Sequence, residues 1–137
     1  KKGQVCKKLV ELVDMYPTLV ELAGLPLPSG LEGCSMDTLL DNPNRNWKKA
    51  AFTQFPRPAY YKKNFDAMGY SIRTDRFHYI EWIDVTKKKP VAVELYDHQA
   101  DPYEETNLAH EQQQQPIIRE LSQLLKNGWK AALPDRR

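Results

Sequence analysis

Several features that mark well-known protein classes are missing from this 137-residue sequence. It has only two cysteines, Cys6 and Cys34, which excludes a disulfide-rich scaffold. No run of about 18 apolar residues occurs, so no segment is expected to span a membrane. The net charge is only +2, which lacks the basic excess of a nucleic-acid-binding domain. The composition, 41% hydrophobic and 28% charged, therefore indicates a globular chain that does not bind nucleic acid.

Signals for processing and modification are also missing. The first residues, Lys1 to Gln4, are polar and precede no apolar stretch, so no signal peptide is expected here. The missing initial Met predicts that the chain belongs to a longer reading frame. No Asn-x-Ser/Thr acceptor occurs, so nothing in these residues supports a glycosylated animal enzyme. Whether Cys6 and Cys34 form a disulfide stays open, because sequence gives no bridging geometry.

The first 24 residues mix a short apolar run with a helix pattern. Residues 5–13 fit either a short buried strand or a first helical turn. Asp14 is expected to be the N-cap of the helix that follows, and Gly24 is expected to end it. The apolar stripe of this helix consists of Met15, Leu19, Leu22 and Ala23.

The next segment, residues 26–46, has the composition of a loop, with one predicted helical turn at residues 36–40. The turn-forming cluster at 42–46 is a candidate boundary between two parts of the chain.

The second part of the sequence predicts a small antiparallel sheet and a helix. Four strands are expected, at residues 50–55, 68–74, 77–83 and 91–96. Pro56 is expected to stop the first strand, and residues 74–76 form a hairpin turn. The final helix is predicted over residues 116–133, with one apolar face. We therefore expect an α+β fold, in which this helix packs on one face of the sheet.

Motifs for catalysis and metal binding are largely absent. No serine lies in a Gly-x-Ser-x-Gly pattern, and neither cysteine has a recognisable base partner. The histidines His78, His98 and His110 show no metal-ligand spacing. His98 lies near Asp97 and Asp101, but a surface hydrogen-bonding role is the simpler interpretation. No catalytic residue and no metal ligand is therefore predicted in this chain.

One loop has the composition of a binding site for an anionic sugar. Arg57 lies between two prolines, and Tyr60, Lys62 and Lys63 follow within a few residues. Cations bind sulfate or carboxylate groups, and aromatic rings stack on sugar faces. These four residues are the candidate substrate-binding residues. The alternatives are a solvated loop, and an Arg57 that pairs with a structural carboxylate.

Two separated segments resemble the sulfatase family. Residues 14–26, DMYPTLVELAGLP, resemble the helix near the end of the sulfatase catalytic domain. Residues 94–109, ELYDHQADPYEETNLA, resemble the sulfatase C-terminal signature, with His98 where leucine is commoner. Residues 53–58 and 68–74 further resemble iduronate-2-sulfatases and their bacterial relatives. By this resemblance the chain is the C-terminal part of an iduronate-2-sulfatase-like enzyme.

The resemblance implies a division of the chain and of the chemistry. Residues 1–47 would be the tail of an alkaline-phosphatase-like catalytic domain, and residues 48–137 the C-terminal subdomain. The family uses calcium and a formylglycine made from a Cys/Ser-x-Pro/Ala-x-Arg motif, and that motif is absent here. The implied partners are the N-terminal catalytic domain and a sulfated glycan. This chain alone is expected to be inactive and to expose apolar surface that the parent covers.

The implied activity of the parent is hydrolysis of 2-O-sulfate esters on uronic acid residues of glycosaminoglycan-like glycans. The implied location is outside the cytoplasm, in a periplasm, in a secreted form or in a lysosome. Two alternatives remain open at this point. One is a stand-alone module that binds acidic glycans. The other is part of an arylsulfatase or a phosphonate monoester hydrolase.

Overall fold

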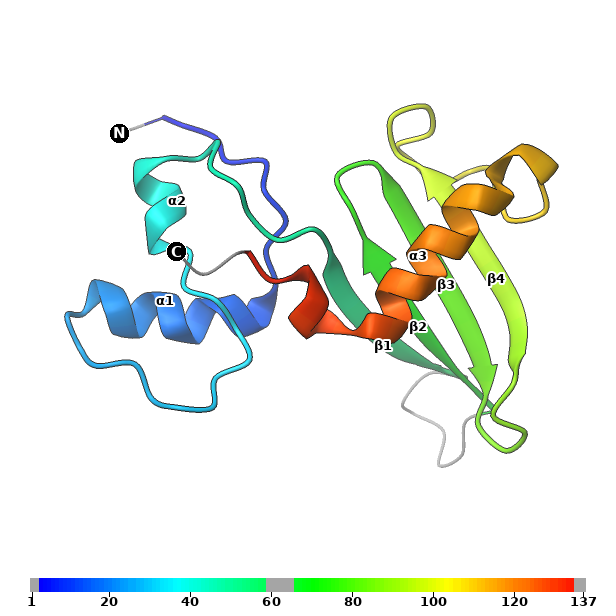
Figure 1. Ribbon diagram of the computed structural model, residues 1–137, viewed down its shortest axis with the longest axis horizontal. Helices are drawn as coiled ribbons and strands as arrows, with labels where there is room; N and C mark the ends of the chain where they lie inside the picture. Colours follow the sequence, from blue (N-terminus) through cyan, green and yellow to red (C-terminus); the bar gives the residue numbers. More distant parts are fainter. Residues whose placement is uncertain (1–2, 59–65, 135–137) are drawn as a thin grey trace.

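A computed structural model describes residues 3–58 and 66–134. It shows an antiparallel sheet crossed on one face by a helix, with the N-terminal segment to one side (Figure 1). The sheet order is β1 (Ala51–Arg57), β2 (Ala67–Arg73), β3 (Phe77–Asp84), β4 (Pro90–Asp97). The helices are α1 (Met15–Leu22), α2 (Asp37–Asp41) and α3 (Gln115–Asn127), with short 3-10 turns at Leu12–Asp14, Gln112–Gln114 and Trp129–Ala132. This arrangement confirms the α+β prediction.

The core lies between α3 and the sheet face that α3 covers. Ile72, Tyr79 and Leu95, from the three strands β2 to β4, are almost completely buried there. Leu121 of α3 belongs to the same cluster, so the apolar stripe predicted for this helix faces the sheet. Tyr79 hydroxyl donates to Glu81 at 2.8 Å, and Ser122 of α3 donates to the same carboxylate at 2.6 Å.

Two predicted boundaries are wrong, each for a local reason. β1 does not stop at Pro56, which pairs with Met68 in register. β1 is an edge strand, where a missing N–H costs no ladder hydrogen bond. α3 ends at Asn127 because Gly128 has φ +75°, a left-handed conformation. The chain then forms the 3-10 turn Trp129–Ala132.

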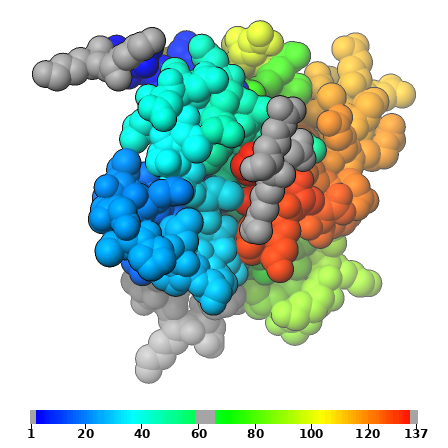
Figure 2. Space-filling model, turned by 60° about the vertical axis from the view of Figure 1, so that its left-hand side comes forward, coloured from blue at the N-terminus to red at the C-terminus, as the bar shows by residue number. Residues whose placement is uncertain are grey.

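Figure 2 shows this last turn, in red, between α3 and the N-terminal part of the chain. The Lys49 N–H donates to the Ala132 carbonyl at 2.9 Å. The end of the chain is thereby attached to the start of the sheet.

The strand interpretation of residues 5–13 is wrong. The structure has no strand there, and it has a 3-10 turn at Leu12–Asp14 that continues into α1. Trp47 Nε1 donates to the Leu9 carbonyl at 2.9 Å, which holds this segment by a side chain and not by a ladder.

Asp14 precedes α1 as predicted, but its carboxylate does not cap the helix. It is fully buried, and Lys48 Nζ lies 2.7 Å from Asp14 Oδ1 and 2.6 Å from Glu11 Oε2. Glu11 also accepts the Phe52 N–H of β1 at 2.8 Å. Burial opposes the charge of Lys48, but the hydrogen bonds to both carboxylates outweigh it and raise the pKa of Lys48. This ion-pair cluster joins the N-terminal segment to the sheet.

The apolar stripe predicted for α1 faces away from the rest of the chain. Met15, Leu19 and Leu22 are each at least half exposed, and Leu12 is 86% exposed. The two buried residues of α1 are Pro17 and Thr18. A contiguous apolar surface of this kind is typical of an interface.

Both cysteines lie within the described residues, and both are thiols. Cys6 is exposed, with its Sγ 3.6 Å from the Pro43 carbonyl oxygen, and Cys34 is half-buried. The disulfide alternative is therefore not formed in this structure.

Replacing Lys48 by Met should lower the free energy of unfolding by about 3–5 kcal/mol, because the Asp14 carboxylate stays buried without its cation. Since the pKa of Lys48 is raised, its stabilisation is present below pH ~10.4 and is lost at higher pH. Urea denaturation measures the change. Lys49→Met is the matched control, because Lys49 is exposed. Equal losses in both variants would contradict the ion-pair argument.

Candidate functional site

The sheet face opposite α3 carries a row of polar and aromatic side chains. Successive residues of a strand point to opposite faces. Tyr79 and Leu95 lie under α3, so their sequence neighbours point to the other face. We call the following residues the outer row: Arg57, Trp82, Glu94 and Tyr96.

Trp82 is the centre of the outer row. Its ring lies over Gly69 of β2, where an added Cβ would come within 2.7 Å of Trp82 Cζ3. Only glycine leaves room for the indole at this point. Trp82 Nε1 donates to Glu94 Oε1 at 2.6 Å, and only 8% of the residue is exposed. The ring is therefore held in one position by packing on one side and by a hydrogen bond at its edge.

Arg57, the one substrate-binding candidate within the described residues, stacks on this ring. Its Cζ lies 4.4 Å from the Trp82 ring centroid, a cation–π geometry. The side chain is exposed at the end of β1. Among residues 3–58 and 66–134, no carboxylate forms an ion pair with it. Within these residues the guanidinium is positioned by an aromatic ring and by no carboxylate.

The other three candidates, Tyr60, Lys62 and Lys63, lie outside the described residues. They follow Arg57 directly in the chain. Arg73, by contrast, donates to the carbonyls of Thr74 and Phe77 at the β2–β3 turn, which is a structural role.

The carboxylate of Glu94 links the two aromatic members of the outer row. It accepts Trp82 Nε1–H on one oxygen and the Tyr96 hydroxyl, at 2.9 Å, on the other. Burial, and after it the Glu94 carboxylate, raises the pKa of Tyr96 to about 12. Tyr96 therefore stays protonated and remains a hydrogen-bond donor at neutral pH.

Next to Tyr96, two histidines meet one carboxylate. The His78 and Tyr96 ring centroids lie 6.3 Å apart. His78 Nδ1 lies 2.7 Å from Glu104 Oε1, and His98 Nε2 lies 2.5 Å from the same oxygen. Burial alone would raise the pKa of Glu104, but the hydrogen bonds from His98 and His78 lower it. The structure thus brings Glu104 together with His78, which lies 26 positions earlier in the chain, and with His98, which lies 6 positions earlier.

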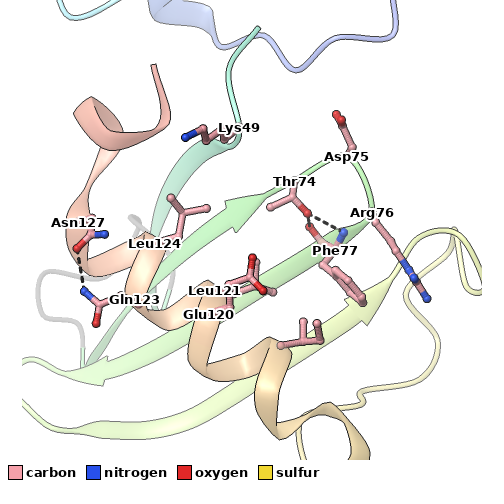
Figure 3. A pocket seen from close by; sticks show the side chains of 11 residues that line it. Lys49, Thr74, Asp75, Arg76, Phe77, Glu120, Leu121, Gln123, Leu124 and Asn127 are labelled. Atoms are coloured by element: carbon pink, nitrogen blue, oxygen red, sulfur yellow. Dashed lines mark hydrogen bonds between the residues drawn. The ribbon is translucent and has the colours of Figure 1, made fainter. Parts of the chain in front are cut away.

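A groove of about 720 Å³ lies on the opposite side, between α3 and the β2–β3 turn (Figure 3). Leu121 and Leu124 of α3 line it, together with Thr74 and Phe77 of the turn. Thr74 Oγ1 accepts the Phe77 N–H at 2.9 Å, and Gln123 donates to Asn127 at 2.8 Å. These polar groups bond to one another, and the groove brings no nucleophile together with a base.

Comparison with known proteins places the chain in a family. Residues 1–131 match the family model described as N-sulphoglucosamine sulphohydrolase, C-terminal. The chain belongs to this sulfatase family. It is 39% identical over 108 residues to mouse (Mus musculus) arylsulfatase K, a match that covers 75% of this chain and 18% of the relative.

Solved structures agree with this assignment. A protein bound to its substrate, D-glucosamine-2-N,6-O-disulfate, superposes with a TM-score of 0.68 and 30% identity, covering 90% of this chain and 25% of that one. A 2-O glycosaminoglycan sulfatase superposes with the same TM-score and 26% identity, covering 87% and 24%. The chain thus spans about a fifth to a quarter of the proteins it matches.

The sulfatase C-terminal region described here does not fit the cofactors of the family. Cys6 precedes Lys7-Lys8 and Cys34 precedes Ser35-Met36, so neither begins a formylglycine motif. Among the described residues, no three aspartates or glutamates lie close enough to one another to hold a calcium ion. Within the same residues, no helix is long and apolar enough to cross a membrane.

Sequence reasoning found Arg57 but missed the other three members of the outer row and the histidine pair, because these depend on strand register. Trp82 pairs with Ala92, and His78 pairs with Tyr96, across the β3–β4 hairpin. Strand bounds alone do not show which residues of β3 and β4 share a face. A register shift between Trp82 and Ile83 separates this pair from the turn at residues 85–89, so counting outward from the turn does not give the pairing.

Replacing Glu94 by Gln should lower the pKa of Tyr96 from about 12, because the carboxylate no longer repels the phenolate. Burial persists, so the pKa should stay above the ordinary value of about 10. Ultraviolet titration of tyrosinate measures the shift, with Tyr96→Phe identifying the signal. An unchanged pKa would show that Glu94 does not act on Tyr96.

Proposed function

We propose that this chain is the C-terminal region of a sulfatase that hydrolyses 2-O-sulfate esters on uronic acid residues of glycosaminoglycan-like glycans. Residues 48–137 form the C-terminal subdomain, and residues 1–47 complete the catalytic domain that precedes it. Catalysis by formylglycine and calcium is assigned to that upstream domain. This region supplies binding groups at the substrate entrance.

The observation that carries the proposal is the guanidinium of Arg57 stacked on Trp82 at an exposed strand end. An arginine fork binds carboxylate or sulfate through two parallel hydrogen bonds. Its orientation is fixed before the ligand arrives, because Trp82 is held by Gly69 and Glu94. Less conformational entropy is then lost on binding.

The residues that follow Arg57 extend this binding surface in the proposal. Lys62 and Lys63 add two positive charges, and Tyr60 adds a ring that stacks on a sugar face. A sulfated uronate carries two anionic groups on one ring. A cluster of several cations therefore suits it better than a substrate with a single negative charge.

The similar proteins support the substrate class and leave a second candidate. One similar structure is titled a 2-O glycosaminoglycan sulfatase, which supports the uronate 2-O-sulfate. Another holds D-glucosamine-2-N,6-O-disulfate, which favours a sulfated glucosamine. Both are anionic sugars that Arg57 could bind, so the experiment below includes both.

The partner of this region is the catalytic domain itself. The exposed apolar side chains of α1, with Leu12 and Val13 before it, form a surface that such a domain would cover. The Lys48 ion-pair cluster then keeps the covered segment in a fixed position relative to the sheet. We place the parent enzyme outside the cytoplasm, in a periplasm, in a secreted form or in a lysosome.

In the full-length enzyme, Arg57→Gln should raise KM for a 2-O-sulfated uronate disaccharide about tenfold, or ~1.4 kcal/mol, with kcat little changed. The reason is the loss of a charge-assisted hydrogen bond to the substrate. KM for a small aryl sulfate should not change, because that substrate does not reach Arg57. Steady-state kinetics on both substrates measure the effect.

The control is Arg119→Gln, since Arg119 is an exposed arginine of α3, which covers the opposite face of the sheet from the outer row. The double variant Lys62→Glu/Lys63→Glu should raise KM for the uronate disaccharide as Arg57→Gln does.

A larger increase in KM for 6-O-sulfated glucosamine than for the uronate would favour the second candidate. Equal effects on disaccharide and aryl sulfate, or none, would remove the role given to Arg57. Glycan binding without any turnover would indicate a binding module.

A further inference from the structure

A cluster of three metal-ligating side chains lies beside the outer row and has no part in the proposed sulfatase function. His78, His98 and Glu104 place one ligand atom each, all within 4.8 Å of one another. Both imidazole nitrogens point at the same carboxylate oxygen, at 2.7 and 2.5 Å. The three side chains are 22%, 23% and 30% exposed, so an ion in solution can reach them.

Three separate parts of the backbone hold this cluster in place. His78 is a residue of β3 and pairs with Tyr96. His98 follows β4, and its N–H donates to the Arg76 carbonyl at 2.9 Å. Glu104 lies in the turn after β4, where the Asp101 carboxylate accepts the Thr106 N–H at 2.8 Å. The ligand atoms therefore converge without any rearrangement of the strands.

Glu104 itself has a backbone conformation that aims its side chain at the histidines. Its φ is +59°, in the left-handed region that few residues other than glycine adopt. The Glu104 N–H donates to the Asp101 carbonyl at 3.3 Å, which closes the turn. A glutamate in this position can reach back over the sheet to His78, 26 residues earlier in the chain.

The chemistry of the donors selects the metal. Two imidazole nitrogens and one carboxylate oxygen are a common ligand set of zinc sites that keep a fourth position for water. Calcium and magnesium prefer oxygen ligands throughout. Nitrogen donors thus favour a divalent transition metal over the calcium that the sulfatase family uses.

We propose that His78 Nδ1, His98 Nε2 and a Glu104 carboxylate oxygen bind a zinc ion, whose fourth coordination position is open to water. Each histidine binds the ion in the neutral form through the nitrogen that faces Glu104, with its one proton on the other ring nitrogen. It joins β3, the end of β4 and the following turn. Binding stabilises the folded state, because an unfolded chain has no such site.

The first test uses the full-length protein, stripped of metal with a chelator and then dialysed against zinc chloride in the presence of excess calcium. Bound zinc is measured by elemental analysis. The wild type should hold one more zinc ion per chain than His98→Leu or Glu104→Gln. His110→Leu is the matched control, because His110 is exposed and outside the cluster. This variant should bind as much zinc as the wild type.

The second test needs only the wild type and so does not depend on how the variants fold. Crystals soaked in zinc chloride should show an anomalous-scattering peak between His78, His98 and Glu104. With calcium already present in excess, added zinc should raise the wild-type melting temperature further. Equal zinc content in the wild type and His98→Leu would overturn the proposal. A soaked crystal with no peak at the three residues would overturn it as well.

Discussion

The packing of α3 on one face of the sheet determines what every other part of this chain can do. Leu121 covers Ile72, Tyr79 and Leu95, which are among the least exposed residues of the protein. Ser122 adds a hydrogen bond from the helix to Glu81 inside this layer. Because strand residues alternate between faces, each apolar position in the core forces its neighbours outward. The outer row exists as a consequence of that burial.

On the outer face, aromatic rings take the place that a second layer would have in a larger domain. The Trp82 ring packs on Gly69 and stacks against the guanidinium of Arg57, and its Nε1–H donates a hydrogen bond to Glu94. One side chain therefore contacts three groups. Tyr96 shares the same carboxylate. A rigid, half-buried surface with a cation at its rim suits recognition of an anionic sugar.

The sequence was sufficient for the elements and insufficient for the groups that span them. The strands, the hairpin at residues 74–76 and the α3 stripe follow from local periodicity, which depends on neighbouring residues. Lys48 could not be matched to Asp14 in advance, because 34 positions separate them and only the fold makes them meet. The same holds for His78 and Glu104. Gly128 was a signal that could have ended α3 correctly, since glycine commonly terminates helices.

The central claim is that Arg57, whose guanidinium stacks on the Trp82 ring, contacts the anionic substrate. A crystal structure of the full-length enzyme with an unreactive 2-O-sulfated uronate disaccharide tests this most directly. The account predicts that a carboxylate or sulfate oxygen of the sugar lies within hydrogen-bond distance of the Arg57 guanidinium, with Trp82 still beneath it. A disaccharide bound in the catalytic pocket with Arg57 directed elsewhere would contradict the account.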